Sequence, residues 1–310
     1  MKNIIVILLV VIIVGLSAYF LITQKNQDVI PATTQPQSNE PADETPVVEQ
    51  EVTEQNKEKS VIGKSVEGRD IIAYHYLPRQ QAGGVGDTEI LFVGGIHGGY
   101  EWNTALVAYE LMDYLKANPD ITPDNIKVTV IPVLNPDGLF KVVGTVERFT
   151  VADVSPSQDV QTSGRFNANN IDLNRNFDCD WQPSAMWQNT AVNGGSQVFS
   201  EPESLAIKNY IETQKPKAVV VWYSAAGGVF ASNCHDGILP ETDIITNIYA
   251  RASGYPAYNS FDFYKLTGDM VNWLAKEKIP AISVLLSTHE DVEWDKNLAG
   301  IKALFLHYAK

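Results

Sequence analysis

From about Ser60 onward the chain alternates short β-branched runs with longer amphipathic segments, and this alternation limits the fold more than any other feature. Short apolar runs rich in Val and Ile are typical of buried strands, whereas apolar residues at helical spacing indicate helices that pack on a sheet. The sequence shows no internal repeat. It therefore predicts an α/β fold: a mixed twisted sheet with helices on both faces.

The individual elements follow from these runs. We expect strands at residues 70–76, 89–95, 127–134, 218–222 and 281–286, and helices at 102–117, 201–214, 243–252, 268–276 and 297–308. The segment Asn135-Pro136-Asp137-Gly138 predicts a turn after the third strand. Because ligands of open α/β sheets bind beyond the strand ends, functional residues should lie there.

The first residues form the most apolar segment of the chain, in which Lys2 precedes an apolar run over residues 4–22 and Lys25 follows it. A run of about 20 apolar residues can cross a bilayer as a helix. A cleaved signal peptide is the alternative, although the run is long for one. The basic flank before the run and the acidic sequence after it favour an external domain. We therefore expect residues 1–24 to anchor a single-pass protein in the cell membrane, with the rest extracytoplasmic.

Residues 25–59 are rich in Glu, Pro, Thr and Gln and poor in aromatic residues. Such a segment cannot bury enough apolar surface to fold, so we expect a disordered acidic linker followed by a folded domain over residues 60–310. The formal net charge of the chain is −14. This charge argues against nucleic acid as a partner, because proteins that bind it concentrate Lys and Arg.

The chain has two cysteines, Cys179 and Cys234. In an oxidising compartment the two thiols can pair, so we expect a disulfide between them. The alternative is two buried thiols that behave as small hydrophobic side chains.

A histidine and a glutamate stand at the end of the second predicted strand, in the segment Gly94-Gly95-Ile96-His97-Gly98-Gly99-Tyr100-Glu101. An imidazole and a carboxylate at a sheet edge can supply two of the three protein ligands of a catalytic zinc. The same two residues also occur at solvated helix starts, so the pair alone leaves both interpretations open.

Further motifs follow in the order found in a known family: Asn135-Pro136-Asp137-Gly138, Arg165-Phe166-Asn167, Asp172-Leu173-Asn174-Arg175-Asn176-Phe177 and Ser200-Glu201-Pro202-Glu203. With these motifs, and with the opening segment over residues 62–69, the chain from about Ser60 to its end resembles the zinc carboxypeptidases. The resemblance implies that His97 and Glu101 bind zinc. Three residues separate this pair, whereas the commonest spacing in the family is two.

The resemblance also implies roles for three polar residues. Asn174 and Arg175 would bind the terminal carboxylate of a peptide, and Arg165 would stabilise the oxyanion that forms at the scissile carbonyl. These residue types suit the task, because a guanidinium fork beside an amide can hold a carboxylate through charge-assisted hydrogen bonds.

Tyr264 precedes Gly268 and Trp273 at spacings similar to those around the mobile tyrosine that covers the substrate in the family. Tyr255 and Tyr258 are close alternatives. The specificity pocket would lie around Val271.

The chain departs from the family where the third zinc ligand is expected, because Tyr223 stands in place of that histidine. A neutral phenol with an ordinary pKa of about 10 is a poor zinc ligand. We therefore expect zinc, held by His97 and Glu101 alone, to be weakly bound or absent. His235 and His289 are the imidazoles that could compensate.

A second departure removes the general base, because Leu285 stands in place of the glutamate that activates water in the family. Alternation along the strand places Ser283 and Leu285 towards the site. Residues 279–288 contain neither Glu nor Asp. Glu290 could substitute only if the following loop folds back.

Three interpretations follow. The first is a family domain that recognises the carboxy-terminal end of a peptide, from an ordinary peptide or a peptidoglycan stem peptide, and is inactive or severely impaired as a hydrolase. The second is an active zinc carboxypeptidase with an unusual ligand set, using His289 or Glu290. The third is a structural protein of the cell envelope.

The expected domain boundary is testable by limited proteolysis. Because the linker is solvated and the α/β region is packed, a protease should release a stable fragment that begins near Ser60. Mass spectrometry of the products identifies the boundary. Early cleavage within the later sequence would argue against a single folded domain.

Overall fold

The computed structural model describes residues 58–77 and 88–309. The membrane anchor predicted for residues 1–24 lies outside these residues, as does nearly all of the linker predicted for residues 25–59. No helix within the described residues is long and apolar enough to cross a membrane.

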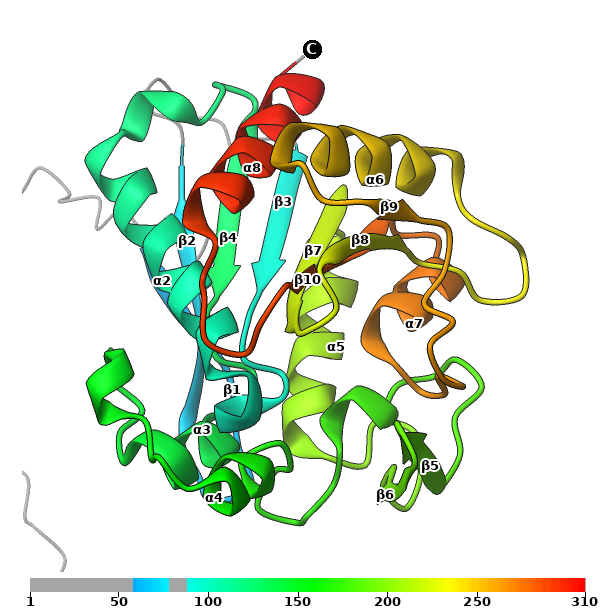
Figure 1. Ribbon diagram of the computed structural model, residues 1–310. Helices are drawn as coiled ribbons and strands as arrows, with labels where there is room; N and C mark the ends of the chain where they lie inside the picture. Colours follow the sequence, from blue (N-terminus) through cyan, green and yellow to red (C-terminus); the bar gives the residue numbers. More distant parts are fainter. Residues whose placement is uncertain (1–57, 78–87, 310) are drawn as a thin grey trace, which may run out of the picture. The chain divides into compact units, whose positions relative to one another are not determined.

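A mixed sheet organises the described residues (Figure 1), with the strand order β1-β2-β4-β3-β7-β10-β8-β9. Its strands are β1 (Lys59–Lys64), β2 (Asp70–Tyr76), β3 (Thr88–Val93), β4 (Ile126–Ile131), β7 (Ala218–Ser224), β8 (Gly228–Ala231), β9 (Ala257–Tyr258) and β10 (Ala281–Leu286). The central strands β4, β3, β7 and β10 are parallel, whereas β1, β2 and β8 pair antiparallel with their inner neighbours. The mixed sheet predicted from the sequence is confirmed.

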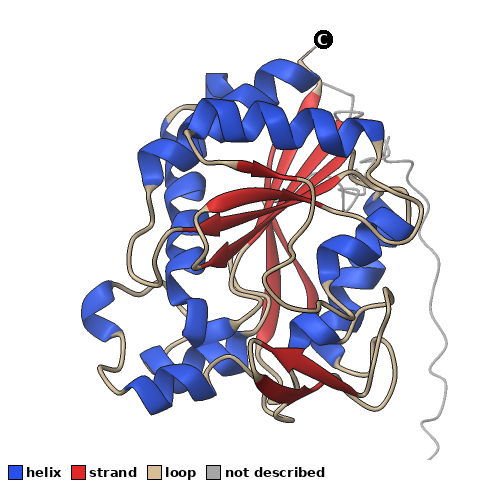
Figure 2. Ribbon diagram, turned by 45° about the vertical axis from the view of Figure 1, so that its right-hand side comes forward, coloured by secondary structure: helices blue, strands red, loops and turns tan. Residues whose placement is uncertain are grey.

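Helices cover both faces of this sheet (Figure 1). The helices α2 (Trp102–Ala117), α6 (Pro240–Ser253) and α8 (Trp294–Tyr308) contribute to the core on one face, and α5 (Pro202–Gln214) and α7 (Met270–Lys276) to the core on the other. The smaller elements are α3 (Pro136–Val143), α4 (Gln158–Ser163) and the short helices η2 (Gly98–Glu101), η3 (Pro119–Ile121), η4 (Val151–Asp153) and η5 (Leu173–Arg175). A separate hairpin of β5 (Ser184–Trp187) and β6 (Thr190–Asn193) lies apart from the main sheet (Figure 2).

Strand β7 shows why the sequences of the central strands are continuous apolar runs. Val220 and Trp222 pack into the core beneath α2 and α8, whereas Val221 and Tyr223 pack into the core beneath α5 and α7. Successive side chains of a strand point to opposite faces, and here both faces are covered. Each residue of β7 is therefore buried.

The turn predicted at residues 135–138 is instead the first turn of α3. The Asn135 side chain accepts a hydrogen bond from the backbone N–H of Gly138 at 2.8 Å, and Pro136 occupies the first helical position. Asn at the N-cap and Pro at the next position are favourable for a helix start as well as for a turn. The local sequence is therefore compatible with both structures.

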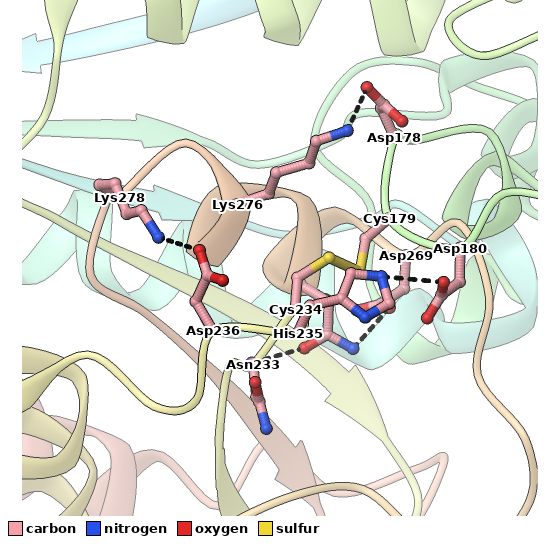
Figure 3. Close-up of a disulfide and its surroundings, with 11 residues drawn as sticks. Asp178, Cys179, Asp180, Asn233, Cys234, His235, Asp236, Asp269, Lys276 and Lys278 are labelled. Atoms are coloured by element: carbon pink, nitrogen blue, oxygen red, sulfur yellow. Dashed lines mark hydrogen bonds and ion pairs between the residues drawn. A yellow bond between two sulfur atoms is a disulfide. The ribbon is translucent and has the colours of Figure 1, made fainter.

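The predicted disulfide between Cys179 and Cys234 is confirmed (Figure 3). It joins the segment after η5 to the segment after β8. The loop before α7 is attached to the same place, because the Gly268 N–H donates to the Cys179 carbonyl at 2.6 Å and the Phe177 N–H donates to the Gly268 carbonyl at 2.9 Å. One crosslink therefore stabilises three segments of distant sequence.

The disulfide should contribute substantially to stability. The cysteines are 55 residues apart, and closing such a loop in the unfolded chain is worth about 4 kcal/mol in the chain-entropy model. The adjacent ion pairs of Lys276 with Asp178 and of Lys278 with Asp236 are exposed and should add little (Figure 3).

This contribution is measured by denaturant unfolding of three samples. They are the native chain, the chain in a thiol reductant, and a Cys179→Ala/Cys234→Ala variant. The reduced chain and the variant should lose similar amounts of unfolding free energy. Equal stability in all three samples would show that the crosslink is dispensable.

Candidate functional site

A cavity of about 440 Å³ lies at the carboxyl ends of the central strands. Its lining includes most of the residues singled out in the sequence: His97, Glu101, Arg165, Asn174, Tyr223, Tyr264, Val271 and Leu285. Arg175, His235 and Glu290 are not part of the lining. A larger hollow of about 1120 Å³ at the β2 edge of the sheet contains none of the predicted site residues.

Glycines place His97 and Glu101 at the cavity. The chain leaves β3 and forms η2, with a φ of +45° at Gly98. A Cβ at Gly98 would come within 2.5 Å of the Gly164 carbonyl, and one at Gly99 within 2.3 Å of Val142. Only glycine tolerates both the backbone angle and this close approach. The loop can therefore pack tightly enough to bury His97 and Glu101.

His97 and Glu101 have the features of metal ligands. The His97 Nδ1 lies 2.9 Å from the Glu101 Oε1. Within the described residues, however, neither ring nitrogen of His97 nor the Glu101 Oε2 makes a hydrogen bond. The His97 Nε2 lies 3.6 Å from the Asp172 Oδ1. Buried polar atoms are nearly always hydrogen-bonded, so the lack of hydrogen bonds at these atoms fits a zinc ion that His97 and Glu101 would hold together.

Tyr223 does not complete this donor set. Its ring lies 5.6 Å from the His97 ring, and its hydroxyl donates to the Asn174 Oδ1 at 3.3 Å. Burial, with the nearby charges of Asp269 and Glu101, raises the pKa of Tyr223 well above its ordinary value. The phenol therefore stays neutral, and zinc would have two protein ligands of the three that a catalytic site uses.

The two departures from the family pattern are adjacent in the structure. Tyr223 and Leu285 are register partners on the parallel strands β7 and β10, and both line the cavity. Ser283 also lines it, as alternation along β10 predicted. The positions expected from the sequence for the third zinc ligand and for the general base therefore form one contiguous patch.

Within the described residues, one other group of metal-binding side chains lies close together: Cys179, Cys234 and His235. The two sulfur atoms are bonded to each other, so this group does not bind a metal while the disulfide is intact. The exposed imidazole of His235 interacts with Asp180 beside the disulfide (Figure 3).

Arg165 is held rigidly at the cavity wall. Its Nε and Nη2 each lie 2.9 Å from the Asp172 Oδ2, and its guanidinium stacks 4.4 Å from the centre of the Trp187 ring. Burial raises the pKa of the Asp172 carboxyl, but the charges of Arg165 and Arg175 outweigh it and hold that pKa well below its ordinary value. The carboxylate therefore stays ionised and keeps the guanidinium in place.

Asn174 presents a hydrogen-bond donor to the cavity. Its Oδ1 accepts from the Met270 N–H at 3.0 Å and from the Tyr223 hydroxyl at 3.3 Å. Because the oxygen is occupied by two donors, the Nδ2 group remains for a ligand. Tyr223, at the third-ligand position, thus helps to orient the amide expected to bind a carboxylate.

Arg175 lies behind the cavity wall. Its Nε and Nη2 donate to the Met186 carbonyl at 3.1 and 3.0 Å, and its Nη1 donates to the Asn174 carbonyl at 2.6 Å. Tyr264, which does line the cavity, has its ring centre 5.9 Å from the Arg175 guanidinium. The substrate-binding roles of Arg175 and Tyr264 remain predictions.

Two further titratable residues line the cavity: His289, considered from the sequence only as a compensating imidazole, and Asp269, which was not assigned a role. His289 packs 4.7 Å from the Tyr100 ring, and burial lowers the pKa of its imidazole. Asp269 caps α7 by accepting from the N–H of Asn272 at 3.2 Å and from its side-chain amide at 2.8 Å. Burial raises the pKa of the Asp269 carboxyl. An Asp before a helix is a recognisable N-cap signal, but no local pattern places His289 in the cavity.

Comparison with known proteins identifies the family. Residues 49–290 match the zinc carboxypeptidases, so the chain belongs to that family. Mouse carboxypeptidase M is 30% identical over 189 residues, which cover 56% of this chain. The matched segment spans 37% of that relative and 26% of rat carboxypeptidase Z, well under two thirds of either.

Solved structures share the fold. Bovine thrombin-activatable fibrinolysis inhibitor, in complex with tick carboxypeptidase inhibitor, has a TM-score of 0.62 at 17% identity and covers 81% of this chain and 89% of its own. The murein-tripeptide amidase MpaA from Escherichia coli O157 has a TM-score of 0.53 at 18% identity, with coverage of 80% and 91%. The family resemblance seen in the motifs is therefore confirmed for family and fold.

The hydrogen bond from Tyr223 to Asn174 gives a test of the cavity wall. A Tyr223→Phe variant leaves the Asn174 oxygen with one donor, so the unfolding free energy should fall by about 1 kcal/mol. Affinity for a peptide with a free carboxylate should also fall, because the amide is less fixed.

Tyr249→Phe is the matched control, since its buried hydroxyl donates to the Asn297 Oδ1 at 2.8 Å on the other face of the sheet. Denaturant unfolding should show similar losses for both variants. Isothermal titration should show weaker peptide binding for Tyr223→Phe alone. Equal peptide affinity in the two variants would contradict the orienting role of Tyr223.

Proposed function

We propose that this zinc carboxypeptidase-family domain recognises the carboxy-terminal end of a peptide and hydrolyses it poorly or not at all. One observation carries the proposal: Tyr223 and Leu285 are adjacent on β7 and β10, where the third zinc ligand and the general base belong. A neutral phenol is a poor zinc ligand and leucine cannot accept a proton.

The carboxylates of the cavity do not replace the lost base. Among the described lining residues they are Glu101 and Asp269. Glu101 lies beside His97 as a candidate metal ligand, and Asp269 is engaged in capping α7. Glu290 is exposed and lies outside the lining.

Asn174, one of the two residues expected to bind the peptide carboxylate, lines the cavity, whereas Arg175, the other, does not. Arg165, expected at the oxyanion, is the guanidinium that the cavity offers in its place. Arg165 is fixed by Asp172, and the Asn174 amide has its oxygen occupied and its N–H group available. Together they can donate charge-assisted hydrogen bonds to a peptide carboxylate. His97 and Glu101 are the residues that would hold zinc, which supplies a Lewis acid for a carbonyl and for water when it is bound.

We propose an ordinary peptide or a peptidoglycan stem peptide as the ligand. The stem peptide draws support from the fold shared with a murein-tripeptide amidase. The apolar run over residues 4–22 and the acidic residues 25–59 support a single-pass anchor and a solvated linker that hold the domain outside the cytoplasm.

One observation favours a second candidate function, an active zinc carboxypeptidase with an unusual ligand set. His289 lines the same cavity as His97 and Glu101. Zinc analysis of a His289→Ala variant tests this candidate, because loss of stoichiometric zinc would identify His289 as the missing donor. A third candidate, a structural protein of the envelope, predicts no affinity for free-carboxylate peptides.

The activity prediction follows from the two substitutions. The native chain should lose zinc on dialysis and cleave carboxy-terminal peptide bonds at background rates. Tyr223→His should strengthen zinc binding with little turnover, whereas Tyr223→His with Leu285→Glu should restore measurable cleavage. The gains should be non-additive, because ligand and base act as one unit and a general base alone contributes about 10²–10⁴-fold.

Zinc content and peptide release are measured without thiol reductant, because reduced Cys179 and Cys234 beside His235 would offer a second zinc site. Leu285→Gln with Tyr223→His is the matched control, since glutamine resembles glutamate in shape but does not accept the proton. Stoichiometric zinc and ordinary turnover in the native chain would overturn the proposed function in favour of the active enzyme.

A further inference from the structure

His289 lies where a ligand in the cavity can contact it. It follows β10, is half-buried, and lines the cavity together with Arg165 and Asn174. Its ring packs 4.7 Å from that of Tyr100, which packs 5.0 Å from that of Trp187. The imidazole is thus part of an ordered aromatic wall.

The orientation of a buried amide determines how His289 is protonated. The Asn103 Nδ2 donates to the Thr288 carbonyl at 2.8 Å and to the Asp291 carbonyl at 2.9 Å. Both acceptors are carbonyl oxygens, so the amide cannot be reversed. The Asn103 Oδ1 therefore faces Ser224, whose hydroxyl donates to it at 3.1 Å.

Ser224 has one hydroxyl proton to give. The same oxygen lies 2.8 Å from the His289 Nδ1. If the hydroxyl proton pointed to His289, the fully buried Asn103 Oδ1 would have no donor among the described residues, an arrangement that folded proteins avoid. Because Ser224 donates its hydroxyl hydrogen to the Asn103 Oδ1, it can only accept a hydrogen bond from His289. The Nδ1 of His289 must then carry a hydrogen.

The second ring nitrogen is left free. The His289 Nε2 makes no hydrogen bond to another described residue. It is also absent from the set of described polar atoms that are both fully buried and without a hydrogen-bond partner. It is therefore accessible to water and to a ligand. In neutral imidazole, a hydrogen on Nδ1 leaves Nε2 with a lone pair.

We propose that the Asn103–Ser224 pair holds His289 in the Nδ1–H form, so that its Nε2 accepts a hydrogen bond from an N–H group of the bound peptide. The inference rests on the proposed function. Arg165 and Asn174 offer donors and so suit a carboxylate, whereas the Nε2 offers an acceptor. The end of a peptide has both partners, a terminal carboxylate and the N–H group of the last peptide bond. The substrate class is thus a peptide whose last linkage is an amide with a free N–H.

The protonation of the ring is tested first, without a ligand. The chain contains five histidines, which can be assigned by ¹⁵N labelling and single substitutions. At neutral pH the Nε2 of His289 should give the resonance of an unprotonated nitrogen. In Ser224→Ala, which removes the acceptor for Nδ1–H, the two ring forms should mix. An Nε2 that carries the proton in the native chain overturns the inference.

Peptide binding by the full chain is tested with two variants of His289. His289→Asn keeps an N–H group near the Nδ1 position but lacks the Nε2 acceptor, and should weaken binding about five-fold, the effect of one hydrogen bond. His289→Gln, which can place its side-chain oxygen near the Nε2 position, should recover part of the affinity.

A depsipeptide in which an ester oxygen replaces the last peptide N–H tests the partner directly. Native chain should bind it about five-fold more weakly than the amide, and His289→Asn should bind both ligands equally. An equal loss for the ester in both proteins would show that His289 is not the acceptor. If no peptide with a free carboxylate binds, the proposed function is wrong, and so is the proposed hydrogen bond from the peptide N–H to the His289 Nε2. The ¹⁵N resonance of the imidazole still shows which ring nitrogen carries the hydrogen.

Discussion

The buried ion pair of Arg165 and Asp172 fixes the side of the cavity wall that carries Arg165 and Asn174. Besides the guanidinium, the Asp172 carboxylate accepts the backbone N–H of Asn174 at 3.1 Å, and the Asp172 N–H donates to the Asn193 carbonyl at 2.9 Å. Asp172 thus connects the arginine and η5 through its carboxylate and the β5–β6 hairpin through its backbone N–H. Removing either charge would leave the other buried and unpaired, which is strongly unfavourable. The carboxylate-recognition groups are therefore tied to the stability of the domain.

The metal-binding half of the cavity is built differently. His97 and Glu101 come from η2 after β3, whereas Tyr223 and Leu285 come from β7 and β10. The two positions proposed to be replaced are register partners packed in the same apolar cluster. Changes there can be accommodated by local packing without disturbing the Arg165–Asp172 pair. The proposed loss of catalytic groups is therefore compatible with an intact set of groups proposed to bind the carboxylate.

The sequence predicts the central architecture well because its signals are local. The predicted bounds of β2, β10 and α2 coincide with the structure, since hydrophobic periodicity marks buried strands and amphipathic helices directly. Strand β1 was not predicted. Neither were the hairpin at 184–193 and the strands β8 and β9. Their short strands carry too few residues for a period to be visible, and their pairing depends on distant partners.

The candidate site was predictable where motif residues point into the cavity. His97, Glu101, Asn174 and Leu285 line it, but Arg175 belongs to the same motif as Asn174 and lies behind the wall. A motif fixes the backbone segment, whereas the direction of a long side chain depends on acceptors such as the Met186 carbonyl in β5. The proposed protonation of His289 depends on Asn103 in α2 and Ser224 in β7, and no local pattern connects these two segments with the one that carries His289.

Recognition and turnover make different physical demands on these groups. Arg165 and Asn174 can bind a carboxylate that does not change during hydrolysis, so they stabilise the bound peptide and the transition state alike. Such uniform binding gives affinity without lowering the barrier. Lowering the barrier requires groups that respond to the charge and the proton that move, and we propose that Tyr223 and Leu285 occupy their positions. If, as we propose, the cavity has the first set of groups and lacks the second, it would bind the end of a peptide without cleaving it efficiently.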